Sequence, residues 1–318
     1  MSRLVLTGAT GFLGAALLDG LDLDGAIALT RGPAPQLSAR GIEVRPCDLG
    51  NPGELPEGCR IIHMAGKVDF SADGQKAMLD LHVEATRGLA AAALKAKCTK
   101  FVLLSSSGTT AVSKAARELD EQAPYPLEIV SRWPYYLSKL YQERLVLDLH
   151  RREGLPVVVL NPSLLLGPGD VRGGSTQVVT DFLDGKILVA PAGGIGIVDV
   201  RDVARATVAA LESGRIGERY FLGSWNTPFA TFFEVLARIA DKPAPALTSP
   251  RGFAPVGARV LSAVLGKQRT EAMSPAKMEM AEHFWYVNWS KATAELGFAP
   301  RRPEATLRDT VADIRRTP

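Results

Sequence analysis

The sequence predicts an α/β fold: a doubly wound, mostly parallel β-sheet with a smaller lobe toward the C-terminus. Two observations carry this prediction. Through the first half of the chain, short apolar runs alternate with longer segments whose apolar residues recur at helical spacing. Beyond Pro168 the alternation becomes irregular and glycines cluster, as at Gly193, Gly194 and Gly196, which indicates where a second lobe begins.

The individual elements follow from the same patterns. The apolar run at residues 4–6 predicts the first strand, and Leu13, Leu17 and Leu21 then recur on one face of a helix. Strands alternating with helices imply right-handed crossovers, so both faces of the sheet are covered and ligands bind at the carboxyl ends of the strands. Further strands are predicted at 26–30, 42–45, 60–64, 101–104 and 157–160, with helices at 78–96 and 135–150.

The later part of the chain is expected to be shared between two domains. Apolar runs at 198–200 and 220–222 predict strands that return to the main sheet, which makes the smaller lobe discontinuous. A loop and a short helix are expected at 241–267. We therefore assign residues 1–165, with a returning segment at about 196–223, to a nucleotide-binding domain, and residues 166–195 and 224–318 to a substrate-binding lobe.

Composition excludes several classes of function. The 318 residues are 46% hydrophobic and 22% charged, and the net charge of +3 gives no electrostatic reason to bind nucleic acid or an anionic membrane. Cys47, Cys59 and Cys98 match neither a disulfide framework nor a zinc site, and no other metal-ligating pattern is evident. The apolar runs fall far short of the ~20 residues that cross a bilayer. We expect a cytoplasmic protein without a membrane span.

A glycine motif lies between the first strand and the first helix. Residues 7–14 read TGATGFLG, with glycines spaced as G-x-x-G-x-x-G. Small residues let the backbone turn tightly and approach a pyrophosphate, whose charge is met by exposed amides at the start of the helix. A glycine turn without a ligand is the alternative. The residues expected to contact a dinucleotide here are Gly8, Thr10, Gly11, Phe12, Leu13 and Gly14.

The end of the second strand indicates which dinucleotide is bound. A carboxylate at this position binds the ribose hydroxyls of NAD, whereas a basic residue accommodates the 2′-phosphate of NADP. Thr30 and Arg31 stand here and no carboxylate does. The sequence therefore favours NADP over NAD, and the alternative is that Arg31 is an ordinary solvated arginine.

Two further clusters carry possible chemistry. Tyr135 and Lys139 are four positions apart, so on a helix they share one face, where the ammonium could lower the pKa of the phenol and make it a proton donor or acceptor. Ser105, Ser106 and Ser107 directly follow a predicted strand, at the edge of the sheet where ligands bind. A hydroxyl there could stabilise charge developing on a substrate oxygen, although polar residues after strands are often plain turn formers.

These pieces stand in an order that resembles the extended short-chain dehydrogenase/reductase family, in particular dihydroflavonol reductases and related NAD(P)-dependent epimerases and dehydratases. The resemblance extends nearly from end to end of the chain and implies a Rossmann-like sheet. The motifs that carry it are residues 7–14, Cys47-Asp48-Leu49, His63-Met64-Ala65-Gly66, Ser105-Ser106-Ser107, the Y-x-x-x-K of Tyr135 and Lys139, Asn161-Pro162-Ser163, and residues 166–170 and 200–204.

The resemblance implies roles for individual residues. Tyr135 is expected to be the acid/base, Lys139 to hold the nicotinamide ribose and tune the tyrosine, and Ser107 to position the substrate oxygen, with Ser106 taking this role if the register slips by one. One departure is His82, which stands where many relatives carry Asn. The remaining cofactor contacts implied are Asp48 and Leu49 beside adenine, Ala65 and Gly66 at the end of the fourth strand, and Pro162 and Ser163 beside the nicotinamide.

The resulting expectation is an NADPH-dependent reductase of a carbonyl group in a small organic substrate, or the reverse alcohol dehydrogenase. A nucleotide-sugar epimerase or dehydratase that uses bound NAD(P) is the enzyme alternative, and a non-catalytic NADPH-sensing protein is a second. Residues 68–70 also resemble carrier-linked thioester reductases, so the substrate class stays open. Relatives are often dimers through the helix that carries the tyrosine, which makes a homodimer possible.

Overall fold

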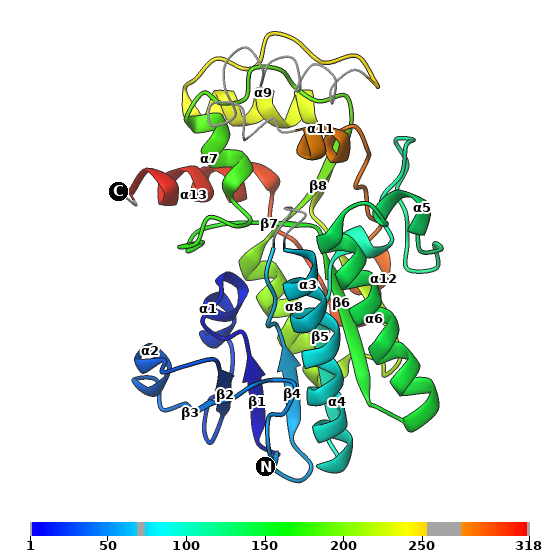
Figure 1. Ribbon diagram of the computed structural model, residues 1–318. Helices are drawn as coiled ribbons and strands as arrows, with labels where there is room; N and C mark the ends of the chain where they lie inside the picture. The colour runs from blue at the N-terminus through cyan, green and yellow to red at the C-terminus, as the bar shows by residue number, and fades with distance from the viewer. Residues whose placement is uncertain (1, 69–73, 253–274, 317–318) are drawn as a thin grey trace.

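The computed structural model describes residues 2–68, 74–252 and 275–316. Within them, seven parallel strands form the main sheet in the order β3-β2-β1-β4-β5-β6-β9 (Figure 1). This reversal of strand order at β1 is that of the dinucleotide-binding sheets, and it confirms the predicted fold class. The strands are β1 Leu4–Thr7, β2 Ile27–Thr30, β3 Glu43–Pro46, β4 Arg60–His63, β5 Lys100–Leu104, β6 Val157–Pro162 and β9 Arg219–Leu222.

Helices cover both faces of this sheet. On one face, α1 (Phe12–Leu18) and α8 (Val200–Ser213) pack against alternate strand residues such as Leu6 and Ile62. On the other face, α4 (Ala85–Lys95) and α6 (Pro134–Glu153) pack against the residues that point the opposite way, such as Val5 and Ile61. Because the central strands are buried on both faces, they read as continuous apolar runs in the sequence.

The helix predicted at 78–96 is interrupted. The chain forms α3 (Gln75–Leu79), a π-helical turn at Asp80–Glu84 and then α4. The wider turn contains His82, whose side chain is fully buried. Hydrophobic periodicity gives no signal for one inserted residue, whereas a π-turn of this kind often accompanies a functional site. The predicted helix at 135–150 is confirmed as α6, which Pro134 begins and Gly154 ends in a left-handed conformation with φ of 76°.

A second, smaller sheet has the order β10-β8-β7 within the described residues. It contains β7 (Leu164–Leu166), β8 (Gly194–Asp199) and β10 (Trp225–Pro228). The prediction that 198–200 returns to the main sheet is therefore wrong. Ile195 and Ile197 of β8 pack against Phe232 of α9 (Phe229–Ala240), so β8 belongs to the smaller sheet. Of the two strands predicted at 198–200 and 220–222, the second joins the main sheet as β9.

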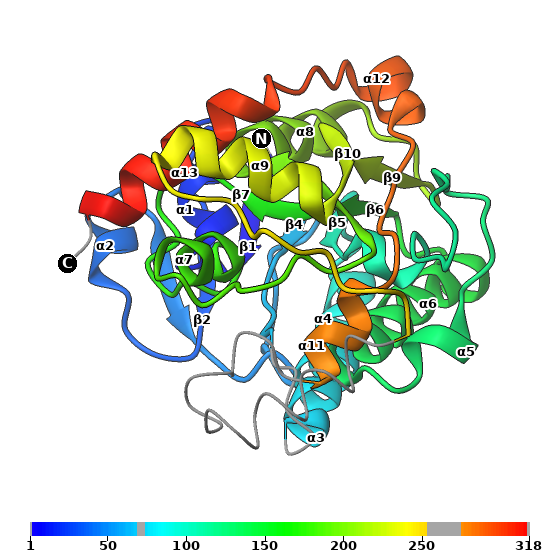
Figure 2. The same cartoon turned by 90° about the horizontal axis from the view of Figure 1, so that it is seen from above.

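Of the remaining helices, α9 and α13 pack against this smaller sheet, and α7 packs against both of them. In Figure 1 the sheet and its helices lie beyond the carboxyl ends of the main strands, and Figure 2 shows α9 and α13 side by side. Of the predicted segment 241–267, residues 241–252 are turns and irregular chain, and the rest lies outside the described residues. The helices not yet named are α2 Pro35–Ser38, the 3-10 turn Ser107–Thr109, α5 Leu127–Val130, α7 Gln177–Leu183, α11 Pro275–Ala281, α12 Ser290–Leu296 and α13 Pro303–Arg316.

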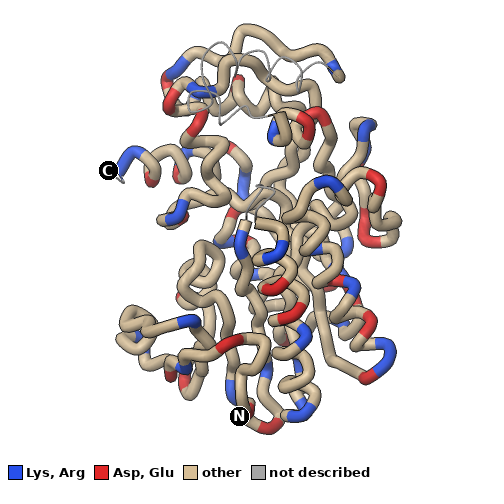
Figure 3. Tube along the Cα trace, in the orientation of Figure 1, with Lys and Arg blue, Asp and Glu red and all other residues tan. Residues whose placement is uncertain are grey.

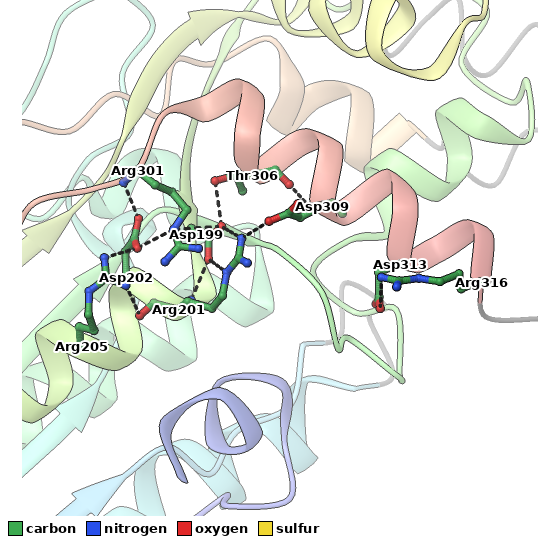
Figure 4. A network of polar contacts seen from close by, with 10 residues as sticks. Asp199, Arg201, Asp202, Arg205, Arg301, Thr306, Asp309, Asp313 and Arg316 are labelled. Carbon is green, nitrogen blue, oxygen red and sulfur yellow. Dashed lines mark hydrogen bonds and ion pairs between the residues drawn. The ribbon is translucent and has the colours of Figure 1, made fainter. Parts of the chain in front are cut away.

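A buried polar network joins the C-terminal helix to the start of α8 (Figure 4). Arg201 donates to Oδ2 of Asp199 at 2.7 Å and to Oδ2 of Asp309 on α13 at 2.7 Å. Arg301 in turn donates to the buried Asp202 at 2.9 Å. Because buried carboxylates are stable only when paired, these contacts fix α13 against α8. They also explain the motif at residues 200–204 as a structural one.

Charges of both signs are spread over the described part of the chain. Lys and Arg alternate with Asp and Glu along the trace in Figure 3, so opposite charges are mixed over the molecule. Among the helices that the structure describes, none is both long and apolar enough to span a membrane.

Candidate active site

The glycine turn is shaped so that side chains are excluded from it. Gly8 has a φ of 72°, and a Cβ added there would lie 2.7 Å from the backbone nitrogen of Ala65. A Cβ on Gly14 would lie 2.5 Å from the carbonyl oxygen of Gly8. Only glycine fits these two positions. No side chain caps Gly11 at the start of α1, which leaves this end of the helix open for a charged group.

The other predicted residues of the turn divide between its surface and its base. Thr10 is exposed and Phe12 half-buried, whereas Leu13 is buried in the core that α1 shares with the sheet. Leu13 and Gly14 therefore support the turn from beneath, and Thr10 and Gly11 lie on the accessible side.

The predicted adenine and ribose contacts lie at the ends of the next two strands. Thr30 ends β2, and its carbonyl accepts a hydrogen bond from Cys47 at 2.8 Å, which brings Arg31 and Asp48 to the same edge. Arg31 is exposed, and its side chain makes no hydrogen bond or ion pair with any described residue. Asp48 is exposed and closes a turn by accepting from the backbone of Gly50 at 2.9 Å, and Leu49 beside it is half-buried.

The three serines after β5 have different partners. Ser105 donates to Glu143 at 2.6 Å, so its hydroxyl is used inside the protein. Ser106 caps the 3-10 turn by accepting from the backbone of Gly108 at 3.2 Å, and its hydroxyl also forms a hydrogen bond with the phenol of Tyr135. Ser107 lines the same cavity as both, but the hydroxyl that affects the pKa of the phenol is that of Ser106. The structure thus brings Tyr135 close to Ser106, the residue expected to act if the register slips by one.

The phenol of Tyr135 does not have the lowered pKa that the sequence predicts. Burial raises its pKa to about 12, and the hydrogen bond with Ser106 opposes this only in part. Lys139 contributes nothing that offsets the burial, because its ammonium donates elsewhere. In this form the phenol keeps its proton at neutral pH, which suits a proton donor.

Lys139 is held in a buried polar network. Its Nζ donates to the carbonyl of Leu104 at 3.0 Å and to Oε1 of Gln142 at 2.9 Å. The amide nitrogen of Gln142 donates to Thr86 at 2.8 Å, and Thr86 contacts a ring nitrogen of His63 at 2.8 Å. Burial lowers the pKa of Lys139 to about 8, and the nearby Glu143 opposes this shift.

His63 completes the connection from Lys139 to the glycine turn. Its other ring nitrogen lies 2.7 Å from the hydroxyl of Thr7, which also accepts from the backbone of Ala65 at 3.2 Å. Burial lowers the pKa of His63 to about 3, so the ring is neutral. His63 is therefore a packed residue at the end of β4.

His82, the departure from the family pattern, takes part in the local network. Its Nε2 accepts from the backbone of Lys67 at 3.1 Å, so Nδ1 carries the proton and donates to Ser138 at 2.8 Å. Ser138 then donates to the carbonyl of Tyr135 at 2.7 Å. Burial lowers the pKa of His82 to about 2. Gly66 packs closely here, because a Cβ on it would lie 3.1 Å from the His82 ring.

Glu143 ties the strand ends behind the site to α6. Its carboxylate is fully buried and forms an ion pair with Arg219 of β9 at 2.9 Å. Five side chains donate to it, from β6, β9 and the segments that follow β5: Ser105, Thr109, Tyr125, Asn161 and Arg219. Glu143 and Gln142 could not be recognised from the sequence, because each is a polar residue at an ordinary helical position.

A cavity of about 330 Å³ opens in front of these groups. Ser106, Tyr135, Pro162 and Ser163 line its end at the main sheet. The Ser163 hydroxyl is buried and has no hydrogen-bond partner, so it is available to a ligand. The remaining wall is largely apolar and comes mostly from the smaller sheet and its helices, with Tyr136, Leu164, Ile195, Phe229, Phe233 and Trp285 among its members.

Charged groups are scarce in that wall. Among the described lining residues, Lys277 is the only cation and Asp181 the only carboxylate. Trp285 lines the cavity, whereas Tyr286 and Trp289, two aromatic residues near it in the sequence, are absent from the described lining. No group of His, Cys, Asp and Glu suited to a metal ion occurs in the ranges that the structure covers.

Comparison with known proteins gives consistent results. Residues 4–223 match the family described as NAD dependent epimerase/dehydratase. The chain is 30% identical to a putative dihydroflavonol 4-reductase of Synechocystis over 97% of its own length and 92% of that protein, and 25% identical to sterol demethylase protein B of Methylococcus capsulatus over 98% of each chain. The crystal structure of gox2253 is similar to it with a TM-score of 0.83 and 28% identity, covering 99% of this chain and 98% of the other.

Proposed function

The chain belongs to the NAD-dependent epimerase/dehydratase family, is an NAD(P)-dependent enzyme of the extended short-chain dehydrogenase/reductase type, and on that premise we propose that it reduces a carbonyl group of a small apolar substrate with NADPH. One observation carries the proposal. A protonated phenol, that of Tyr135, is hydrogen-bonded to Ser106 at the end of a mostly apolar cavity, with Lys139 one helical turn away.

The chain has groups that suit the cofactor at each part of its site. The turn surface at Gly8 and Gly11, with Gly14 packed beneath it, suits the diphosphate, and the exposed Arg31 suits a 2′-phosphate. Asp48 and Leu49 would lie beside adenine. Lys139 has one ammonium hydrogen without a partner in the described structure, which suits a ribose hydroxyl. The unpartnered Ser163 beside Pro162, and Ala65 and Gly66 at the end of β4, would adjoin the nicotinamide end.

In the proposed reaction, Ser106 and Tyr135 act on the carbonyl oxygen. NADPH, if held by the groups named above, would supply the hydride for the carbonyl carbon. Ser106 donates a hydrogen bond to the oxygen, and Tyr135 transfers its proton to that oxygen as negative charge develops there. Lys139, one helical turn from the phenol, would bind the nicotinamide ribose through its ammonium. The net change is one C=O bond reduced to an alcohol.

We assign the role of positioning the oxygen to Ser106 in place of Ser107. The hydroxyl of Ser106 is near enough to the phenol of Tyr135 to lower its pKa, so one substrate oxygen beside them can contact both groups. The strand β5 ends at Leu104, and the 3-10 turn that begins at Ser107 carries that residue away from the strand direction.

A nucleotide-sugar epimerase or dehydratase is less well supported. Structures of such enzymes share the fold, for example a dTDP-glucose 4,6-dehydratase from Streptomyces venezuelae with a TM-score of 0.75 at 20% identity. A sugar nucleotide brings a second diphosphate, which needs cationic partners, and Lys277 is the only cation in the described lining of the cavity. A sensor that only binds NADPH would have no use for the paired Ser106 and Tyr135.

The domain division, the location and the partners are proposed as well. We assign residues 166–195 and 224–318 to the substrate lobe, because α7, α9 and α11 supply much of the apolar wall. The cytoplasmic location, the homodimer through α6 and the absence of a nucleic-acid partner stay predictions.

NADPH oxidation measured over a panel of aldehydes, ketones and acyl thioesters, with NADH as the control cofactor, tests the proposal. We expect turnover with at least one apolar aldehyde or ketone and a preference for NADPH. Retention of bound cofactor through purification, together with sugar-nucleotide conversion and no NADPH consumption, would establish the epimerase alternative. A preference for NADH would refute the role given to Arg31.

A further inference from the structure

A polar pair interrupts the apolar wall of the cavity. Gln177 and Asp181 lie one turn apart on α7, in the smaller lobe, and both line the cavity that Tyr135 and Ser106 enter from the main sheet. Asp181 is 6% exposed. The amide of Gln177 donates to its Oδ1 at 2.9 Å, and Nζ of Lys186 lies 3.7 Å from the same oxygen.

Both of these contacts fall on one carboxylate oxygen. In the described part of the chain, Oδ2 of Asp181 accepts no hydrogen bond, and Lys186 is too far from Oδ1 for one. The Oδ2 oxygen is not fully buried, and Asp181 lines the cavity, so Oδ2 can accept a hydrogen bond from a ligand there. The side-chain oxygen of Gln177, which is exposed, accepts no hydrogen bond from the described residues and is a second acceptor beside it.

The side chains elsewhere in the cavity suggest what lies between the two polar ends. The rings of Tyr136 and Trp285 lie 4.6 Å apart at 31° and form part of one wall. Phe229 and Phe233 form part of another, on the same side as α7. Such surfaces suit a flat apolar group.

We propose that Asp181 and Gln177 form a second subsite, which accepts a hydrogen bond from a hydroxyl group at the end of the substrate remote from the reacting carbonyl. The inference rests on the proposed function and narrows it to one substrate class: uncharged carbonyl compounds with an apolar ring and a ring hydroxyl. A hydroxyl donates to a carboxylate in a strong, charge-assisted hydrogen bond, and a site built around such a bond rejects analogues that lack the donor.

Benzylacetone and its para-hydroxy and para-methoxy derivatives provide the test. For the wild-type enzyme with NADPH, we expect kcat/KM to be at least about tenfold higher for the hydroxy ketone than for the other two, of which neither has a ring donor. In Asp181→Leu the ratio falls to about one. Asp181→Asn, which keeps the shape of the side chain, lowers the ratio if the leucine variant fails to fold. Equal values in the wild type, or an unchanged ratio in the Asp181 variants, would overturn the proposal.

Asp184→Leu is the matched control. Asp184 follows α7 directly, lies outside the described cavity lining and forms an ion pair with the same Lys186 at 2.8 Å. We expect this variant to keep the preference for the hydroxy ketone. Loss of the preference in both variants would show that the charge around Lys186, and not the subsite, controls it.

A binding measurement separates failure of the subsite from failure of the proposed reaction. Para-ethylphenol and para-ethylanisole carry no carbonyl, and their binding to the NADP⁺-loaded enzyme is measured by titration calorimetry. We expect at least about tenfold tighter binding of the phenol, lost in Asp181→Asn. If the phenol binds in this manner but no ketone is reduced, the subsite stands and the reductase proposal fails. If ketones are reduced while phenol and ether bind equally, the subsite proposal fails.

Discussion

The ammonium of Lys139 donates to Oε1 of Gln142 across 2.9 Å, inside a polar network that reaches the glycine turn through His63 and Thr7. Both side chains are buried on α6. The lysine is therefore oriented by the protein before any ligand arrives. Gln142 acts through Lys139, as a positioning residue, and touches neither the cavity nor the phenol.

Replacement of Gln142 by leucine tests this positioning. We expect kcat/KM to fall about tenfold, because a hydrogen bond to a charged group contributes ~1.5–3 kcal/mol. The loss of an acceptor further lowers the pKa of Lys139, so the alkaline limb of the pH profile moves to lower pH. The pH dependence of kcat/KM is the measurement, and Gln122→Leu at an exposed position is the control. A lower rate with the alkaline limb of the pH profile at its wild-type position would indicate damage to the fold and not a change at Lys139.

The wild-type pH profile should report a single group near neutrality. Lys139, with its pKa lowered to about 8, is charged below that pH and loses its proton above it, so kcat/KM for reduction declines as the pH rises through about 8. His63 and His82, with pKa values of about 3 and 2, stay neutral and add no step near pH 6.5. Tyr135 keeps its proton throughout this range. A pronounced acid limb between pH 6 and 7 would contradict this assignment.

Alanine substitutions at the neighbouring serines decide which one positions the oxygen. We expect Ser106→Ala to lower kcat about 10²-fold, the usual effect of removing one donor to a developing oxyanion, and Ser107→Ala to lower it much less. Steady-state kinetics with the same ketone and saturating NADPH measure both. The reverse order of effects would return the role to Ser107.

The carboxylate of Glu143 should matter for stability. Glu143→Leu leaves the guanidinium of Arg219, whose side chain is 13% exposed, without its buried ionic partner. Breaking a buried pair in this way costs about 3–5 kcal/mol of the free energy of unfolding. Urea unfolding measures the loss, with Glu153→Leu at an exposed position of the same helix as control. A loss below about 1 kcal/mol would show that Arg219 finds other partners.

The sequence predicted the elements whose signal is local. Short segments contain the apolar run before Gly8, the glycines at which a Cβ would clash, and the pair of Tyr135 and Lys139. The main sheet follows from the alternation of apolar strands with amphipathic helices. The partner of β8 could not be predicted in this way, because it depends on α9, whose aromatic residues are distant in the sequence.

The functional details that escaped prediction depend on single residues in three dimensions. A change of one position at the end of β5 decides between Ser106 and Ser107, and hydrophobic patterns do not mark where a strand ends to that accuracy. Gln142 and Asp181 resemble solvated helix residues in the sequence. Their burial is decided by segments far along the chain, among them those that carry Thr86 and Phe233.

The proposed mechanism depends most on Tyr135 as the proton donor, and Tyr135→Phe tests this role directly. NADPH binding, followed by the fluorescence of the cofactor, should be retained, while kcat for ketone reduction should fall at least about 10²-fold, the lower range of a general acid's contribution. The phenylalanine ring keeps the packing against Tyr136, whose ring centroid lies 5.0 Å away. A variant that binds NADPH and reduces the ketone at the wild-type rate would contradict the proposed mechanism.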